Sequence, residues 1–219
     1  MLFRSSAKLV ADLLSTAGAD RVVSVDLHSG QIQGFFNFPF DHLTALPVLS
    51  DYLEHQLGLS GGDLVVVAPD TGRVKTAERL REHLHADLAF VYKRRSRHEA
   101  HKIEESAVVG DVSGRPCVLI DDIADTGGTF VQGAMALAKD GAGPVYAAAT
   151  HPLLSGKAVQ NLEEAPIQEV VVTNTVPIPE EKRFPKLTVL SIAPIIAQAL
   201  RAVFEDTSVS EIFRGENQL

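Results

Sequence analysis

The stretch Cys117–Phe130, CVLIDDIADTGGTF, passes from an apolar run directly into three carboxylates and then into a Thr-Gly-Gly-Thr turn. Residues 117–121 have the composition of a buried strand. In open α/β sheets, ligands bind beyond the carboxyl ends of the strands, and Asp121 and Asp122 fall at such an end. The stretch therefore predicts a strand that is followed by a ligand-binding loop.

The residues after the acids have the character of a phosphate-binding loop. Gly127 and Gly128 have no side chain to block the close approach of an anion to the backbone. Thr129 begins a predicted helix, so unpaired N–H groups and the positive end of the helix dipole face the loop, and Thr126 adds a hydroxyl donor. Alternatively, the Asp-Thr pair is a helix N-cap and the glycines form a simple turn.

The carboxylates of Asp121 and Asp122 repel phosphate, so we expect them to bind a different part of the ligand. They suit the hydroxyls of a sugar, as acceptors, or a hydrated Mg²⁺ ion. A phosphate site next to a polyol site predicts a sugar phosphate. The loop is not a Walker A motif, because no lysine follows the glycines.

The rest of the chain alternates between two kinds of segment. Short apolar runs, rich in Val and Ile, predict strands that are covered on both faces: Arg21–Leu27, Asp63–Ala68, Leu88–Tyr92, Cys117–Asp121, Val145–Thr150, Glu169–Thr173 and Leu187–Ser191. Segments with helical spacing lie between them: Ser6–Gly18, Leu46–Leu57, Arg73–His85, Thr129–Asp140, Gly156–Glu163 and Pro194–Phe204. This order predicts an α/β fold with a mainly parallel sheet that is flanked by helices.

Composition excludes several classes of protein. The 219 residues carry a net charge of −8, so a nucleic-acid-binding protein is not expected. The single cysteine, Cys117, lies in an apolar run and suits a reducing compartment. No apolar run approaches the length of a membrane span, and the N-terminus has no signal-peptide pattern, so we expect a cytoplasmic protein.

The acidic loop resembles the phosphoribosyl-diphosphate motif of the phosphoribosyltransferase superfamily. The resemblance implies that Asp121 and Asp122 contact the hydroxyls of a ribose. It also implies that the next five loop residues enclose the 5-phosphate: Asp125, Thr126, Gly127, Gly128 and Thr129.

Four further stretches narrow the resemblance to the ribose-phosphate diphosphokinases of the phosphate-activated type. They are VDLHSGQIQGFF at Val25–Phe36, VAPDTGR at Val67–Arg73, VYKRRSR at Val91–Arg97 and ATHPLLSG at Ala149–Gly156. Each stretch alone also has a structural interpretation, such as a buried histidine, a turn-forming aspartate or a solvated basic face. Together they extend the resemblance from about Ser6 to Phe213.

The resemblance implies an activity and roles for specific residues. Members of this family transfer the β,γ-diphosphoryl group of ATP to O1 of ribose 5-phosphate and release AMP, with Mg²⁺ as the cofactor. His28 and Asp70 match the metal-associated positions. Lys93 and Arg95 match a mobile catalytic loop, whose charges meet the negative charge that develops during the transfer.

The resemblance also implies how the chain is organised. Residues 1–45 are expected to be the remnant of an N-terminal phosphoribosyltransferase-like domain, and 46–198 a C-terminal domain of the same kind that binds ribose 5-phosphate. Residues 199–219 are expected to form a helix and a tail that return to the N-terminal portion. The family forms homo-oligomers, which are dimers that build hexamers.

The chain departs from the family pattern in three respects. Arg73 stands where the family has glycine, and Ser96–Ser106 is more charged than the equivalent stretch of the family. The N-terminal portion that contributes to ATP binding in the family is missing. Two alternatives therefore stay open. One is a non-catalytic or regulatory homologue that binds ribose phosphates, and the other is a phosphoribosyltransferase.

Overall fold

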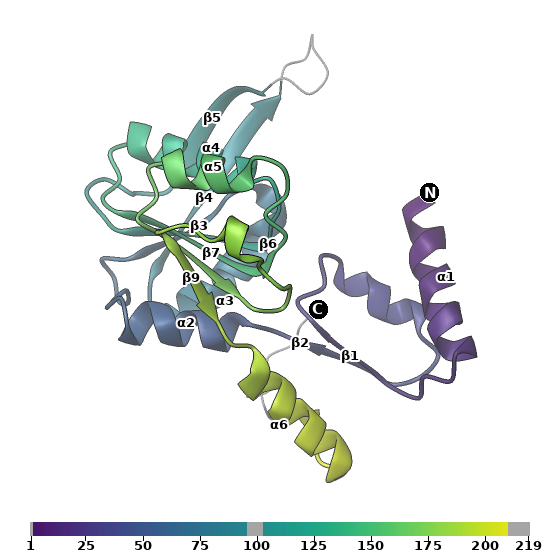
Figure 1. Cartoon of the computed structure of the whole chain (residues 1–219). Helices are drawn as coiled ribbons and strands as arrows, with labels where there is room; N and C mark the ends of the chain where they lie inside the picture. The colour runs from purple at the N-terminus through teal and green to yellow at the C-terminus, as the bar shows by residue number, and fades with distance from the viewer. Residues whose placement is uncertain (1, 96–102, 210–219) are drawn as a thin grey trace. The chain divides into compact units, whose positions relative to one another are not determined.

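The computed structural model describes residues 2–95 and 103–209 (Figure 1). The chain forms two compact units. The first unit comprises Met1–Ala45 and Ile192–Leu219, and the second comprises Leu46–Ser191. Among the described residues, no helix has both the length and the apolar character needed to cross a membrane.

The second unit is built on a sheet whose strands have the order β5-β4-β3-β6-β7-β8-β9. All neighbouring strands run parallel except β4 and β5, which are antiparallel. The strands are β3 (Val65–Ala68), β4 (Asp87–Arg95), β5 (Ile103–Val109), β6 (Cys117–Ala124), β7 (Val145–Pro152), β8 (Glu169–Thr173) and β9 (Leu187–Leu190). The prediction of an α/β fold with a mainly parallel sheet is therefore confirmed.

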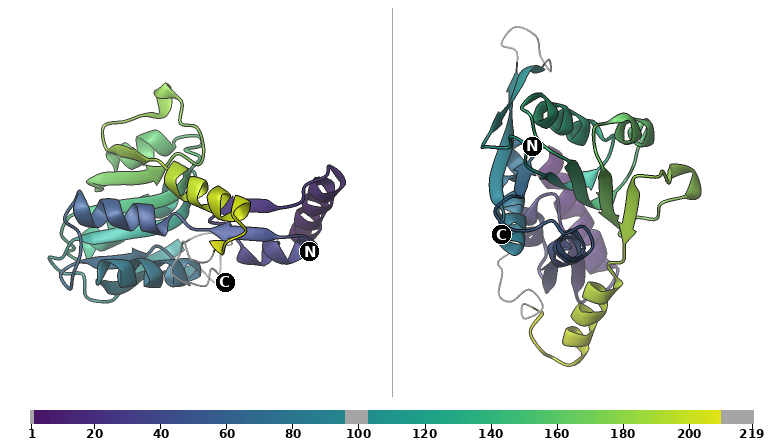
Figure 2. Two further views of the ribbon diagram at one scale, coloured as in Figure 1. Left: turned by 90° about the horizontal axis from the view of Figure 1, so that it is seen from below. Right: turned by 90° about the vertical axis from the view of Figure 1, so that its left-hand side faces the viewer.

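Four α-helices cover this sheet, two on each face. Helices α2 and α3 lie on one face, and α4 and α5 lie on the other (Figures 1 and 2). Their bounds are α2 (Leu46–His55), α3 (Val74–Leu84), α4 (Gly128–Lys139) and α5 (Ala158–Glu164), and short 3-10 turns occur at η2 (Thr71–Arg73) and η3 (Glu180–Lys182).

Burial on both faces explains why the sequence of the strands is nearly all apolar. All four residues of β3 are buried, as are four of the five residues of β8. A strand covered by helices on both sides has no solvent face, so the apolar and polar residues do not alternate. Helix α4 packs closely on β6, since a Cβ added at Gly133 would lie 2.9 Å from Leu119 Cδ2.

The strands at the basic and acidic stretches are longer than the sequence predicted. Strand β4 continues to Arg95, so the backbone of Lys93 and Arg95 belongs to a strand and the expectation of a loop there was wrong. The cause is the unpredicted strand β5, which pairs with β4 and places Lys93 opposite Ser106. Strand β6 likewise continues past the acids to Ala124, because β7 pairs with it as far as Pro152.

The first unit contains a pair of parallel strands, β1 (Val22–Val25) and β2 (Phe40–Leu43), of which β2 was not predicted. It also contains α1 (Leu2–Thr16), the 3-10 helix η1 (Gly30–Phe35) and α6 (Ala193–Phe204). The turn after β1 is held by side chains of residues near β2. The Leu27 N–H donates to His42 Nε2 at 2.8 Å, and the Asp26 carboxylate accepts from the Ala45 N–H at 2.9 Å.

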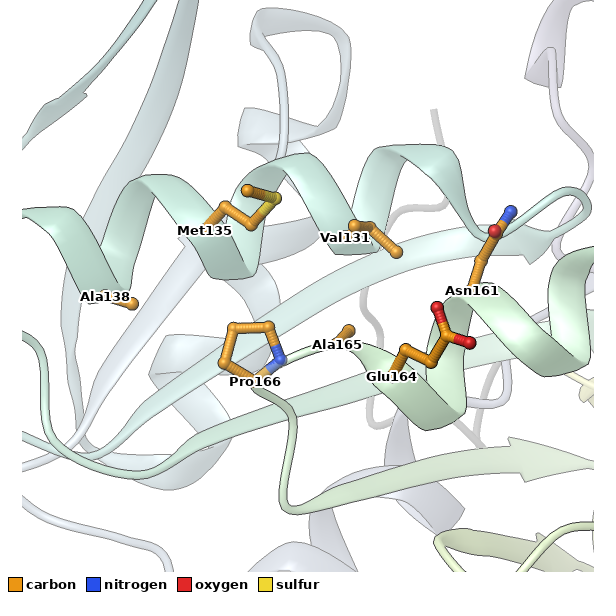
Figure 3. Close-up of a pocket in the computed structure, with 7 residues that line it drawn as sticks. All are labelled: Val131, Met135, Ala138, Asn161, Glu164, Ala165 and Pro166. Atoms are coloured by element: carbon orange, nitrogen blue, oxygen red, sulfur yellow. The ribbon is translucent and has the colours of Figure 1, made fainter.

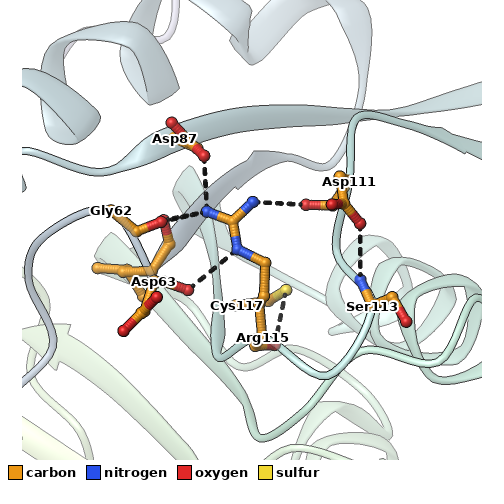
Figure 4. A network of polar contacts seen from close by, with 8 residues as sticks. Gly62, Asp63, Asp87, Asp111, Ser113, Arg115 and Cys117 are labelled. Carbon is orange, nitrogen blue, oxygen red and sulfur yellow. Dashed lines mark hydrogen bonds and ion pairs between the residues drawn. The ribbon is translucent and has the colours of Figure 1, made fainter.

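Arg115 joins the loops at the amino ends of the central strands of the second unit (Figure 4). Its guanidinium donates to the carbonyl oxygens of Gly62, Asp63 and Asp111. It also donates to Asp87 Oδ2 at 2.7 Å. One side chain thus satisfies carbonyl groups of the loops that lead into β3 and β6 and also pairs with the first residue of β4.

We expect the substitution Arg115→Met to lower the free energy of unfolding by about 2 kcal/mol, because hydrogen bonds to a charged donor contribute more than neutral ones. Urea unfolding followed by circular dichroism measures this loss. Arg115→Lys keeps the charge but lacks the planar guanidinium. Its free energy of unfolding should lie between those of the wild type and Arg115→Met. A Met variant as stable as the wild type would show that water replaces these contacts at no cost.

Candidate functional site

The predicted site lies where the strand order of the second unit changes direction. From β3 the chain proceeds to β4 and β5 on one side, and it then returns to β6 on the other side. The carboxyl ends of β3 and β6 diverge at such a point and leave a crevice in which ligands bind in open α/β folds. Asp70 follows β3, and Asp121 and Asp122 lie near the end of β6.

The two acids of β6 are buried and are paired with Arg73. Asp121 is 9% exposed and Asp122 is 7% exposed. Arg73 reaches them from the turn η2, with its Nε 2.9 Å from Asp121 Oδ1 and its Nη2 2.9 Å from Asp122 Oδ2. The Asp122 N–H also donates to Asp121 Oδ1 at 2.9 Å. The pair is thus a charged cluster that joins the segment after β3 to β6.

The environment of Asp121 favours its protonated form. Burial raises the pKa of this carboxyl from 3.8 to about 7, and the side chain of Asp122 adds to the rise, whereas the charge of Arg73 opposes it. Two adjacent carboxylates away from water do not readily ionise together. Near neutral pH, a proton on the pair is therefore in exchange with solution.

The loop that follows β6 presents unpaired backbone amides. Among the described residues, no acceptor is found for the N–H groups of residues 126–130. Helix α4 begins at Gly128, so its positive dipole end adds to their effect. Amides in this arrangement bind an anion such as a phosphate group.

Helix α5 and the residues before it hold this loop in place. The Asn161 side chain donates to the Thr126 carbonyl at 3.0 Å, and the Ser155 N–H donates to the Asp125 carbonyl at 2.9 Å. Gly127 has a positive φ of 75°, and a Cβ added there would lie 3.0 Å from Leu162 Cγ. The position therefore requires glycine both for its backbone conformation and for the close approach of α5.

The sequence analysis missed two of the polar groups near these strand ends. Nothing in the sequence around Asn161 indicated a contact with the loop, because this residue lies in an ordinary amphipathic helix. His151 lies at the end of β7, where its Nδ1 is 2.9 Å from Thr175 Oγ1. The Thr175 hydroxyl in turn donates to the Thr150 carbonyl at 3.0 Å. The ATHP stretch indicated that the residues around His151 matter, but it did not indicate the contact with Thr175.

A hollow of about 440 Å³ lies between α4 and α5, outside the predicted site. Figure 3 shows the α4 side chains on one side and residues of α5 and the following segment on the other. The lining comprises Val131, Met135, Ala138, Asn161, Glu164, Ala165 and Pro166. None of the predicted site residues lines it, so the loop and the acid pair are not part of this hollow.

The remaining predicted residues are His28, Asp70, Lys93 and Arg95. His28 follows β1 in the first unit, whereas Asp70 belongs to the second. Asp70 Oδ1 accepts from the Gly72 N–H at 2.9 Å. The side chains of Lys93 and Arg95 lie outside the described residues, although their backbone lies in β4. No group of three or more metal-binding side chains occurs among the residues that the structure describes.

The raised pKa of Asp121 predicts how the protein's stability depends on pH. The folded state retains a proton that the unfolded chain loses above its ordinary value of 3.8, so stability from this group falls as the pH rises towards about 7. Asp121→Asn removes this dependence. We expect the variant to gain stability relative to the wild type across that range and the difference to level off above it. Urea unfolding at a series of pH values checks this, and a constant difference would contradict the raised pKa.

Comparisons with known proteins agree on one family. The model of the phosphoribosyl synthetase-associated domain matches residues 96–214. The ribose-phosphate pyrophosphokinase of Mycobacterium bovis is 52% identical over 212 residues, which is 96% of this chain and 64% of that protein. The enzyme of the same name from Streptomyces avermitilis is 52% identical over 208 residues, 95% of this chain and 64% of that protein.

A solved structure shares both the sequence and the fold. The crystal structure of phosphoribosylpyrophosphate synthetase from Mycobacterium smegmatis has a TM-score of 0.82 and 54% identity, and the match covers 92% of this chain and 64% of that one. The chain thus spans 64% of the length of these relatives, which is less than two thirds. On these grounds, the chain belongs to the phosphoribosyl synthetase family, in which its relatives are named ribose-phosphate pyrophosphokinases.

Proposed function

We propose that this chain takes part in the transfer of the β,γ-diphosphoryl group of ATP to O1 of ribose 5-phosphate, giving phosphoribosyl diphosphate and AMP. The unpaired amides of residues 126–130, beside two buried carboxylates, carry this proposal. Similarity to the ribose-phosphate pyrophosphokinases at 52% identity supports the choice of reaction.

The two parts of the site divide the sugar phosphate between them. The backbone N–H groups of the loop bind the 5-phosphate, and the hydroxyls of Thr126 and Thr129 add donors. The carboxylates of Asp121 and Asp122 accept hydrogen bonds from the sugar hydroxyls. This division places the negative phosphate at the positive end of α4 and the neutral hydroxyls at the acids.

The transfer forms a bond between O1 of the sugar and the β-phosphorus of ATP and breaks the bond from that phosphorus to the oxygen that leaves with AMP. Such a reaction depends mainly on alignment and on charge neutralisation. Lys93 and Arg95 are proposed to supply positive charge to the transferred group and the leaving oxygen. Their place on β4, next to β3, puts their backbone on the strand that adjoins the switch point.

Mg²⁺ bound to ATP would neutralise the charge of the phosphate chain. Asp70 fits a contact with such an ion, because Oδ1 is the only one of its two carboxylate oxygens that has a hydrogen-bond partner within the described residues. Mg²⁺ on a nucleotide requires few protein ligands, and one or two carboxylates suffice. His28 is proposed as a second metal-associated residue, with contact through water.

We further propose a cytoplasmic homo-oligomer built from dimers. The first unit supports this view, since Leu9, Val10 and Leu13 of α1 are all more than half exposed. Large exposed aliphatic side chains that lie together on one helix are typical of an interface between chains.

Incubation of the chain with Mg²⁺, ATP and ribose 5-phosphate should form AMP, as measured by chromatography. We expect Lys93→Ala to lower this rate by about a hundredfold or more, because a positive charge in the transfer step is lost. Its affinity for ribose 5-phosphate, measured by calorimetry, should not change. Lys75→Ala, an exposed lysine at the start of α3, is the matched control.

The outcomes of this experiment separate the alternatives. Equal loss of rate and affinity in Lys93→Ala would assign Lys93 a structural role. Binding of ribose 5-phosphate without AMP formation would identify a non-catalytic homologue. Consumption of preformed phosphoribosyl diphosphate with an added nucleobase would identify a phosphoribosyltransferase.

Two glycines at the ends of α4 provide a matched test of the phosphate loop. Gly127 and Gly141 have φ values of 75° and 76°, so alanine strains the backbone at both positions. We expect Gly127→Ala to weaken ribose 5-phosphate binding by about tenfold or more, because displacement of the loop removes hydrogen bonds to a charged phosphate. Gly141→Ala should lose less stability, because a Cβ there would meet only Ser113 Oγ at 3.9 Å, and it should keep its affinity. Calorimetry and thermal unfolding measure the two effects, and equal affinities would argue against the loop as the phosphate site.

A further inference from the structure

The Arg73 side chain bridges both acids of the predicted sugar site. It lies at the end of η2, and its guanidinium meets one oxygen of Asp121 and one oxygen of Asp122, each at 2.9 Å. The Arg73 side chain is only 16% exposed. A buried fork of this kind fixes the direction in which each carboxylate points.

The acids need a cation at this place. Two neighbouring carboxylates in a buried strand repel each other and lose their hydration, and a positive group must offset both effects. The charged groups that act on Asp121 are Arg73 and Asp122. Arg73 therefore provides the counter-charge that makes the pair an acceptor for hydroxyl groups.

A divalent metal ion does not fit at the same acids while Arg73 is in place. The guanidinium already uses an oxygen from each carboxylate, and a second cation within a few ångströms would repel it. Nor do the described residues offer a cluster of three metal-binding side chains that would compensate for the loss. Binding of a metal at this pair would require Arg73 to leave.

We propose that Arg73 is a positioning residue for the pentose, which acts as the built-in counter-cation of Asp121 and Asp122, so that ribose 5-phosphate binds at the acid pair without a metal ion. This inference rests on the sugar-phosphate site proposed above. It assigns Mg²⁺ to the nucleotide and Arg73 to the sugar.

The test measures the affinity for ribose 5-phosphate by calorimetry, in EDTA and in millimolar Mg²⁺. We expect the wild type to bind equally in both buffers. Arg73→Met removes the charge, so its affinity in EDTA should fall by about tenfold or more. Mg²⁺ should restore much of that affinity, because the ion then occupies the vacated place between the carboxylates. A purely structural role of Arg73 would not create such a dependence on the metal.

Two further variants complete the design. Arg73→Lys keeps the charge without the bidentate geometry and should show an intermediate loss in EDTA. Lys75→Met removes a positive charge two residues away, from an exposed side chain, and should behave as the wild type does.

Each outcome decides the inference. A wild type that binds only with Mg²⁺ overturns it, even if Arg73→Met fails to fold, while the sugar-phosphate site itself stands. An Arg73→Met variant that binds as the wild type does in EDTA also overturns it. A wild type that binds in neither buffer overturns the proposed sugar-phosphate site and this inference together.

Discussion

The burial of Asp121 and Asp122 within an otherwise apolar strand is the constraint on which the site depends. Strand β6 lies between β3 and β7, and its acids are nearly inaccessible to solvent. The chain compensates with Arg73, which comes from the segment after β3. The contacts of Arg73 thus also tie the segment after β3 to β6.

The two ends of the sheet in the second unit satisfy their polar groups differently. At the amino ends, Arg115 donates to three carbonyl oxygens in the two loops that lead into β3 and β6. At the carboxyl ends, the amides of residues 126–130 have no acceptor among the described residues. Unpaired polar groups cost free energy, and they are retained where a ligand binds. The Arg115 network and the proposed phosphate loop therefore lie at opposite ends of the same sheet.

The loop owes its shape to α5 as much as to its own residues. Gly127 adopts a positive φ, which its type permits, but the contact with Leu162 and the hydrogen bond from Asn161 determine where the loop lies. A loop held in this way pays little ordering entropy when it binds a phosphate.

The sequence by itself determined the α/β class, the position of most strands and helices, and the loop at residues 125–129. These features are local, because runs of Val and Ile, helical spacing and glycine pairs act within a few residues. It did not determine β5, which is seen as a strand only in its pairing with the edge of β4. Nor did the sequence reveal which residues Arg73 contacts. Arg73 was noted only because the family has glycine at that position. Only the tertiary structure shows that Arg73 pairs with Asp121 and Asp122. The physical reason is that electrostatic interactions act through space, between residues that are far apart in the sequence.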